Sequence, residues 1–354
     1  SLGTSGNDQI GDYQYLDTYS FGIDQYQNSV GIFPTRLFNP NFSWESNEKR
    51  EVALELGMLG DRIRLNAAHY RNTSSNQLVG IPLPATTGFS SVNDNLNATV
   101  LNEGWELGLH AIIARSEKFT WETSLNLTIP KTRLESFPDL EGSTFANRLK
   151  VGEPLNIAKV YQVNGVDPET GLYVFEDFNN DGTITSVDDR EAIARLDPKY
   201  FGGFTSQWTY GKLTVDALFQ FSKQLGRNFW STGGVAPGGL ANQPNEVLDR
   251  WTPSETDADI QRFTAGQSPE ARQSYRNYVS SDAGISDASF LRLKTVSLSY
   301  NLVAKKDNGL GCILFLRGQN LWTWTNYLGL DPETQNSATV PPLRMVTLGT
   351  RFTF

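Results

Sequence analysis

The residues best suited to chemistry lie in the acidic stretch "EDFNNDGTITSVDDRE", residues 176–191, which places carboxylate or amide oxygens at alternate positions before a bend at Asp181-Gly182. Counted from its first Asp, the stretch matches the EF-hand calcium loop, in which oxygen ligands alternate and a glycine at position six allows a tight turn. We therefore predict a site for calcium, or for magnesium as a second hard cation. Its predicted ligands are Asp177, Asn179, Asp181, Thr183 and Asp188.

The predicted metal loop departs from the EF-hand pattern at its last ligand. Position twelve is Asp188, whose side chain is one methylene shorter than the usual bidentate Glu. The alternative is a plain surface turn in which Asn and Asp side chains accept hydrogen bonds from their own backbone and hold no ion. No helix pattern of normal length flanks the loop, so we expect it to pin an outer connection rather than to act as a calcium sensor.

Four tryptophans are candidates for contact with a substrate or a partner. Aromatic faces bury the apolar surfaces of sugars and also suit peptide side chains. The alternative is that these rings pack inside loops or form a girdle of aromatic residues beside lipid. The candidates are Trp230, Trp251, Trp322 and Trp324, of which the last two are preferred.

Several classes of chemistry are excluded by residue types. The two histidines, His69 and His110, form no H-x-x-x-H or H-E-x-x-H pattern, and the lone Cys312 cannot make a disulfide or a thiolate zinc site. No G-x-S-x-G nucleophile elbow is present. A formal net charge of −9 argues against a nucleic-acid partner, because phosphates require a surplus of Lys and Arg. We expect neither catalysis nor nucleic-acid binding.

Alternation of apolar and polar residues predicts a series of antiparallel hairpins. Along the first of them Val52, Leu54 and Leu56 share one face, while Glu51 and Glu55 lie on the other. Aromatic residues make up 12% of the chain, which also favours β-structure. The predicted strands are 52–58 with 63–67, 105–111 with 119–129, 204–210 with 213–221, 296–300 with 312–321, and 346–354.

Tight turns alternate with long connections along the chain. The long connections are predicted at about 8–41, 80–102, 130–200, 223–287 and 322–342. This alternation is typical of outer-membrane barrels, whereas soluble sandwiches mix their loop lengths. We therefore predict an all-β protein, an antiparallel transmembrane β-barrel, with polar faces toward a wet lumen. A soluble β-sandwich with one buried face stays open, because alternation alone does not reject it.

The two ends of the chain fit the same interpretation. Alternation continues to Phe354, as expected of a last strand that pairs with the first to close a barrel. We count about 10 strands, with the first cut off at Ser1.

Five segments carry a resemblance to a known family. The segments "GNDQIGDYQYL", "GVDPETGLYVFEDFNNDGTIT", "FLRLKTVSLSYNL", "GQNLWTWTNYLGLDPE" and "RMVTLGTRFTF" resemble the C-terminal half of the SusC/RagA family of TonB-linked outer-membrane transporters of Bacteroidetes. The resemblance covers essentially the whole chain in order. It implies the last 10 or so strands of a 22-stranded barrel in the outer membrane of a Gram-negative bacterium. The N-terminal plug and the TonB box of the family are not in this sequence.

The resemblance also implies a function and partners. It implies TonB-dependent import of an oligosaccharide or a peptide, with a SusD-type surface lipoprotein as a lid, TonB acting through the N-terminal part, and outer-membrane lipid around the barrel. The long connection 223–287 would hinge or grip the SusD-type partner. The alternatives are a siderophore receptor of the same barrel type and a secreted, calcium-stabilised β-domain that binds glycan.

Overall fold

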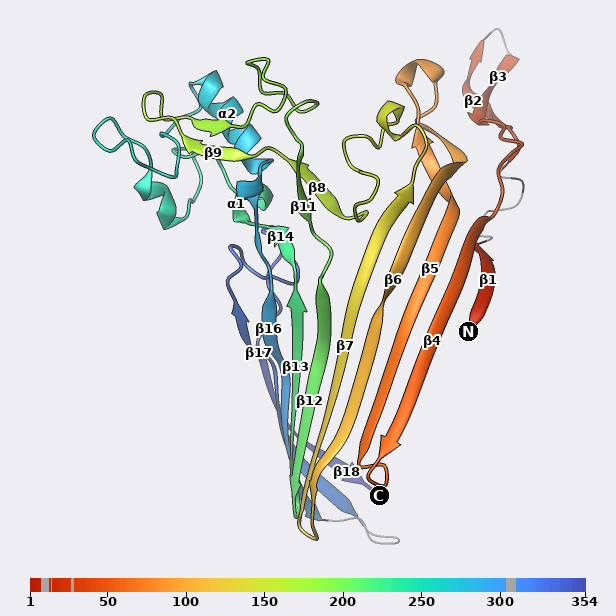
Figure 1. Cartoon of the computed structure of the whole chain (residues 1–354), viewed down its shortest axis with the longest axis vertical. Coiled ribbons are helices and arrows are strands. Elements are labelled where there is room, and N and C mark those ends of the chain that lie inside the picture. Colours follow the sequence, from red (N-terminus) through yellow and green to blue (C-terminus); the bar gives the residue numbers. More distant parts are fainter. Residues whose placement is uncertain (8–12, 14, 27–28, 304–309) are drawn as a thin grey trace. The chain divides into compact units, whose positions relative to one another are not determined.

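The computed structural model describes residues 1–7, 13, 15–26, 29–303 and 310–354. Most of the first segment of the family resemblance, residues 6–16, and the start of the predicted connection 8–41 lie outside these described residues. Ten strands form one sheet in which neighbours along the sheet follow one another along the chain (Figure 1). In sheet order these strands are β1 (Leu2–Asn7), β4 (Glu45–Met58), β5 (Ile63–Pro82), β6 (Ser91–Arg115), β7 (Phe119–Ser136), β12 (Tyr200–Tyr210), β13 (Leu213–Lys223), β16 (Phe290–Val303), β17 (Gly311–Thr325) and β18 (Met345–Thr353).

The remaining strands form small two-stranded sheets within the long connections. These are β2 (Thr18–Tyr26) with β3 (Ser29–Arg36), β8 (Ile157–Val160) with β11 (Ala192–Arg195), β9 (Val163–Val166) with β10 (Tyr173–Phe175), and β14 (Leu225–Arg227) with β15 (Ile285–Asp287). The helices are α1 (Phe229–Thr232) and α2 (Pro269–Val279), with short 3-10 turns η1 (Ala85–Thr87), η2 (Leu140–Gly142), η3 (Asn245–Asp249) and η4 (Asp282–Gly284). In the described part of the chain, neither helix has the length and apolar character needed to cross a bilayer.

The predicted hairpins and the all-β class are confirmed. Every predicted strand coincides with a strand of the ten-stranded sheet, give or take a terminal residue, and the pairs with a defined register are antiparallel. Two of the tight turns contain a glycine in the left-handed region, with φ of +64° at Gly60 and +58° at Gly211. Such left-handed angles suit glycine because it has no Cβ to clash.

The connection between β5 and β6 is shorter than the predicted 80–102. Both strands continue into Ser- and Asn-rich sequence, so that residues 83–90 alone lie between them. Backbone pairing does not need apolar side chains. A strand can therefore continue beyond the segment in which apolar and polar residues alternate. For the same reason β7 continues to Ser136 and β17 to Thr325, into regions that were predicted as connections.

The chain divides into two compact units. Unit 1 comprises residues 1–53, 68–104 and 131–155, and unit 2 comprises residues 54–67, 105–130 and 156–354. In unit 1 the buried side chains of Ala98, Leu134 and Phe137 form a small apolar core. Unit 1 also carries half-buried ion pairs, such as Arg133 with Glu135 at 3.1 Å.

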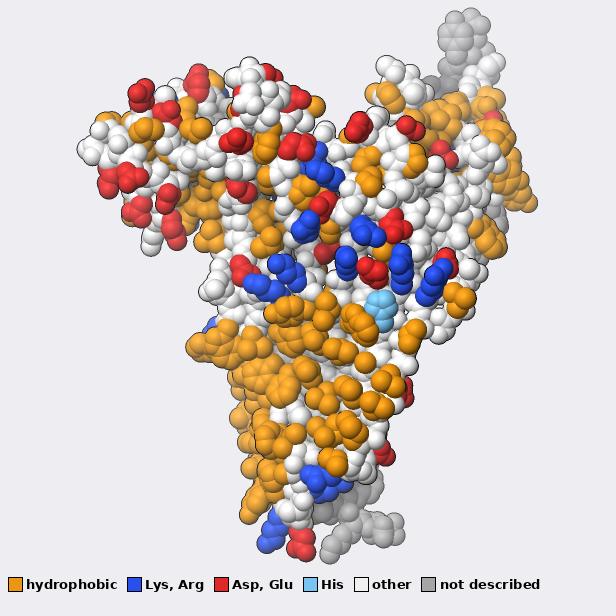
Figure 2. Space-filling view, viewed as in Figure 1, with side chains coloured by type: hydrophobic (Ala, Val, Ile, Leu, Met, Phe, Trp, Pro, Cys, Tyr) orange, Lys and Arg blue, Asp and Glu red, His pale blue; other side chains and the backbone are white. Residues whose placement is uncertain are grey.

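Unit 2 contains a two-faced stretch of sheet. On β13 the apolar row Val215, Ala217 and Phe219 pairs with apolar residues of β16 and with Trp208, Ser206 and Phe204 of β12. These β13 side chains stay partly exposed, and in the described chain no second sheet covers them. Figure 2 shows hydrophobic side chains gathered into a continuous patch over the strands. A soluble sandwich would bury this row, so the structure favours a lipid-facing surface.

The opposite face of the same strands is polar. The Gln207 side-chain amide donates to Asp216 at 2.7 Å, and His110 Nδ1 lies 3.0 Å from Ser124 Oγ. Gln207, Asp216 and Ser124 lie on one side of the sheet, because the registers of β7, β12 and β13 place alternate residues there. The alternation predicted from the sequence therefore separates an apolar face from a polar face.

The long connections of unit 2 build a small core of their own. Its buried members are Tyr161, Tyr173, Phe175, Trp230, Val247, Ile260, Tyr275 and Tyr278. The Tyr173 and Tyr278 rings stack with centroids 3.9 Å apart. Helix α2 begins at Pro269 because Ser268 caps it, accepting the Ala271 N–H at 3.2 Å. These connections are therefore folded structure rather than simple loops.

Candidate functional site

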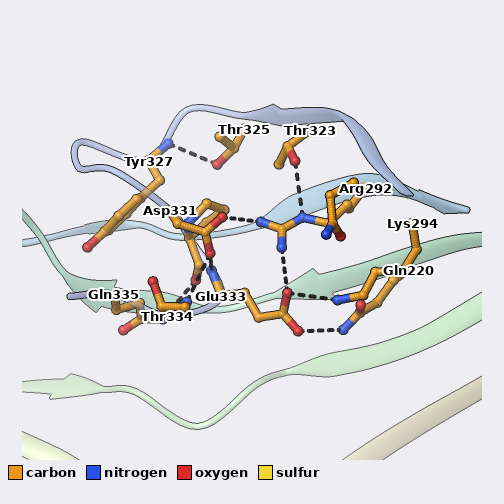
Figure 3. Close-up of polar contacts among 12 residues, drawn as sticks. Gln220, Arg292, Lys294, Thr323, Thr325, Tyr327, Asp331, Glu333, Thr334 and Gln335 are labelled. Carbon is orange, nitrogen blue, oxygen red and sulfur yellow. Dashed lines mark hydrogen bonds and ion pairs between the residues drawn. The ribbon is translucent and has the colours of Figure 1, made fainter. Parts of the chain in front are cut away.

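A polar network lies near the start of β16, on the face opposite the apolar row of β13. Figure 3 shows its contacts. Its centre is Arg292, which is 1% exposed. The guanidinium donates to the carboxylate of Asp331, to Glu333 at 2.6 Å, and from Nε to Thr323 Oγ1 at 3.1 Å. Three groups from β17 and the segment after it thus surround one arginine of β16.

Glu333 and Asp331 extend the network. Glu333 also accepts the Gln220 side-chain amide at 3.2 Å and the Lys294 ammonium at 3.3 Å. The second oxygen of Asp331 accepts the backbone N–H groups of Glu333 and Thr334, each at 3.0 Å. The network therefore ties the segment after β17 to the polar faces of β13 and β16.

Burial makes this network important for structure. A charge taken out of water is tolerated only when it is paired and hydrogen-bonded, and removing one partner of such a pair typically costs about 3–5 kcal/mol. Sequence reasoning missed the network, although Arg292 and Asp331 lie in the family segments "FLRLKTVSLSYNL" and "GQNLWTWTNYLGLDPE". The available signal was one arginine alternating with Leu291 and Leu293.

The predicted metal loop bends as expected, and its carboxylates accept backbone hydrogen bonds. Asp177 accepts the N–H groups of Gly182 at 2.8 Å and Asp181 at 3.3 Å. Asp181 in turn accepts the Thr183 N–H at 2.7 Å and an N–H of the Asn179 side chain at 2.9 Å. Gly182 has a φ of +80°, the left-handed bend for which glycine was expected.

The loop is closed by Asp189 rather than by the predicted Asp188. Asp189 is fully buried and accepts the N–H groups of Phe178 at 2.9 Å and Thr185 at 2.7 Å. Asp188 is exposed and accepts the Thr185 hydroxyl at 2.8 Å. Counting EF-hand positions missed Asp189, because it is one residue beyond the twelfth position.

In the structure the donor set also forms a self-contained turn. Among the residues that the structure describes, no three His, Cys, Asp or Glu side chains are grouped to hold a metal ion. The loop satisfies its acceptors internally, as in the alternative of a plain Asx-rich turn. Calcium or magnesium at Asp177, Asn179, Asp181, Thr183 and Asp188 stays a prediction.

Trp230 and Trp251 pack inside the connections. Trp230 is 6% exposed and meets Tyr278 edge-on with centroids 6.1 Å apart. Trp251 donates from Nε1 to the Pro168 carbonyl at 3.0 Å and covers Gly171, where an added Cβ would lie 2.5 Å from its ring. Their placement favours the packing alternative over free contact with a substrate.

Trp322 and Trp324 lie on the apolar face of β17. Their ring centroids are 6.0 Å apart, and they are 56% and 50% exposed. Ladder register pairs them with Leu293 and Leu291, on the face opposite Arg292. This position fits the aromatic girdle that flanks the lipid-facing band of a barrel. The position favours the girdle alternative, and contact of these two rings with a substrate or a partner stays a prediction.

An antiparallel sheet with one continuous apolar face and one polar face is the architecture of a transmembrane β-barrel wall. No family model matches the chain. The chain is 28% identical to "TonB-dependent receptor P26" of Formosa agariphila, over 100% of this chain and 39% of that protein. It is 25% identical to "TonB-dependent receptor SusC" of Bacteroides thetaiotaomicron, over 96% of this chain and 35% of that protein.

Solved structures agree with these relatives on the fold. The "RagAB peptide transporter" matches 99% of this chain and 40% of that chain, with a TM-score of 0.78 and 22% identity. The chain thus spans well under half the length of the relatives it matches. The predicted resemblance to the SusC/RagA family is confirmed, because the curated relatives are TonB-dependent receptors that include SusC. These relatives are named as receptors rather than as enzymes.

Proposed function

We propose that this chain forms the C-terminal part of the barrel of a TonB-dependent importer in the outer membrane of a Gram-negative bacterium. The observation that carries the proposal is the uncovered apolar row Val215, Ala217 and Phe219 on an antiparallel meander with a polar reverse face. The similarity to TonB-dependent receptors over the whole chain supports it. A soluble domain would have no reason to leave this row uncovered.

The proposed cargo is an oligosaccharide or a peptide. Similarity to SusC and to the RagAB peptide transporter supports this range without choosing within it. A SusD-type lipoprotein would cover the outer side, and TonB would act through an N-terminal plug outside this sequence. Import of this kind needs differential binding and gating, with no covalent change to the cargo. The Arg292 network would keep the segment after β17 in place during these movements.

Cell fractionation tests the proposal. We expect the protein in the outer-membrane fraction, extractable by detergent only, with a lipoprotein co-purifying. A protein that stays soluble in buffer would instead be the secreted glycan-binding domain, and this outcome overturns the proposal. Tight binding of an iron chelate, with no lipoprotein partner, would identify a siderophore receptor.

Calcium in the loop is a separate, smaller proposal. If Asp177 and Asp181 hold the ion, calcium raises the melting temperature of the protein, and Asp181→Ala abolishes the rise. Glu141→Ala is the control, because Glu141 is an exposed acid outside the loop. Equal melting temperatures with calcium and with a chelator would show a plain turn.

A further inference from the structure

A cleft of ≈ 640 Å³ opens among the folded connections of unit 2. Its walls come from α1, from residues 244–260 and from residues 328–330, three segments that are distant in sequence. The volume lies within the range of small-molecule and short-peptide sites. None of these residues belongs to the Arg292 network or to the predicted metal loop.

The floor of the cleft is apolar and held in place. Phe229, Trp230 and Ile260 line it, and the last two belong to the buried aromatic core of unit 2. Leu248 and Leu330 add exposed apolar surface. A preformed apolar floor costs little to organise when a ligand binds.

The rim of the cleft is acidic. Its five charged lining residues are Glu246, Asp249, Glu255, Asp257 and Asp259, with no Lys, Arg or His among the lining residues. Within the described chain none of the five forms an ion pair, and all are exposed. The single cation of segment 244–260, Arg250, lies instead 3.7 Å from the centre of the Phe263 ring. Figure 2 shows Asp and Glu side chains gathered over the part of unit 2 that contains α1 and α2.

We propose that this cleft binds a basic peptide, with ammonium or guanidinium groups at the rim and an apolar side chain on the floor. Unpaired carboxylates beside a low-dielectric floor attract a cation more strongly than carboxylates in open water do. A neutral oligosaccharide offers no charge to these acids. The role of the cleft in capturing cargo rests on the proposed import function. The binding of a basic peptide to the cleft does not depend on that function.

The test compares two labelled pentapeptides, Leu-Lys-Leu-Lys-Leu and Leu-Glu-Leu-Glu-Leu, by fluorescence anisotropy on the detergent-purified protein. Maltopentaose serves as the neutral competitor. The cleft variant carries Glu246→Gln, Asp249→Asn and Asp257→Asn, which remove charge without changing shape. The matched control carries Glu117→Gln, Glu141→Gln and Glu169→Gln, three exposed acids elsewhere in the chain. A second variant, Leu330→Gln, tests the floor alone.

We expect the lysine peptide to bind at least about tenfold more tightly than the glutamate peptide, with the cleft variant losing about that factor and the control less than about twofold. Leu330→Gln weakens binding of the lysine peptide, and added salt weakens this binding further. Equal binding of both peptides, no binding of either, or equal loss in the cleft and control variants overturns the proposal. So does a cleft that a co-purified lipoprotein occupies instead. Fractionation uses no peptide, so failure here leaves the import function standing.

Discussion

The sheet and the folded connections of unit 2 use the same aromatic residues in opposite ways. On β17, Trp322 and Trp324 are half exposed beside leucines of β16. In the connections, Trp230 is buried against Tyr278 and its neighbours. The proposed lipid surroundings account for the difference, because an uncovered aromatic ring is stable beside lipid and is disfavoured in water. A tryptophan in this chain therefore has no fixed role that its residue type alone would reveal.

The largest predicted effect is on stability, when the loss of a tryptophan ring from the connections is compared with the loss of one from the sheet. Trp230→Ala leaves a cavity in the aromatic core and should lower the free energy of unfolding of this segment by about 3–5 kcal/mol. Trp322→Ala in the same protein should cost about 1 kcal/mol or less, because its ring is on the surface. Limited proteolysis of residues 224–289 under increasing denaturant measures the difference. Equal sensitivity would remove the contrast between the regions.

A charge placed on the sheet should separate its two faces. Val215→Arg puts a cation on the apolar row, where a charge costs up to about 2–4 kcal/mol at the bilayer midplane and less toward its edges. Thr214→Arg, one residue away on the polar face, is the matched control and should cost much less. Folding yield in lipid vesicles, followed by heat-modifiable migration on a gel, reports the outcome. If both substitutions are tolerated equally, the apolar face does not touch lipid.

Within the connections, Asp189 should contribute more to the stability of the protein than its neighbour Asp188. Asp189→Ala removes the acceptor of two part-buried N–H groups, those of Phe178 and Thr185, and should cost about 1–3 kcal/mol. Asp189→Asn keeps one acceptor oxygen and should restore part of the loss. Asp188→Ala should change stability by less than about 0.5 kcal/mol. Thermal unfolding of the four proteins measures this, and a larger effect at Asp188 would contradict it.

The smallest effect at neutral pH concerns the tyrosines of the aromatic core. Burial raises the pKa of Tyr173, Tyr275 and Tyr278 above its ordinary value. These phenols stay protonated in the folded segment. Their contribution to the free energy of unfolding is therefore complete below about pH 10, the ordinary tyrosine pKa, and is lost as the pH rises above that value. Tyrosinate absorbance should show these three ionising only on unfolding. Ionisation together with the exposed tyrosines would contradict the burial.

How much of the fold and of the candidate site the sequence predicts depends on how far apart the interacting residues are along the chain. Hairpins such as β12–β13 follow from local alternation, and their turn at Gly211 follows from a local backbone requirement. The ion pair between Arg292 and Asp331 joins residues 39 positions apart in no periodic pattern, so the sequence does not predict it. The face of Trp322 also depends on a register shift in β16 between Leu293 and Thr295. Alternation alone cannot be followed through such a bulge.

Spin labels on β13 test the lipid-facing row most directly. With Cys312→Ser removing the native thiol, a nitroxide at Val215→Cys or at Thr214→Cys is compared by its collisions with oxygen, which enriches in lipid, and with a water-soluble nickel chelate. We expect the label at position 215 to meet oxygen far more often than nickel, with the opposite preference at position 214. A label at position 215 that is shielded from both reagents would place the row against protein and would contradict the transport account.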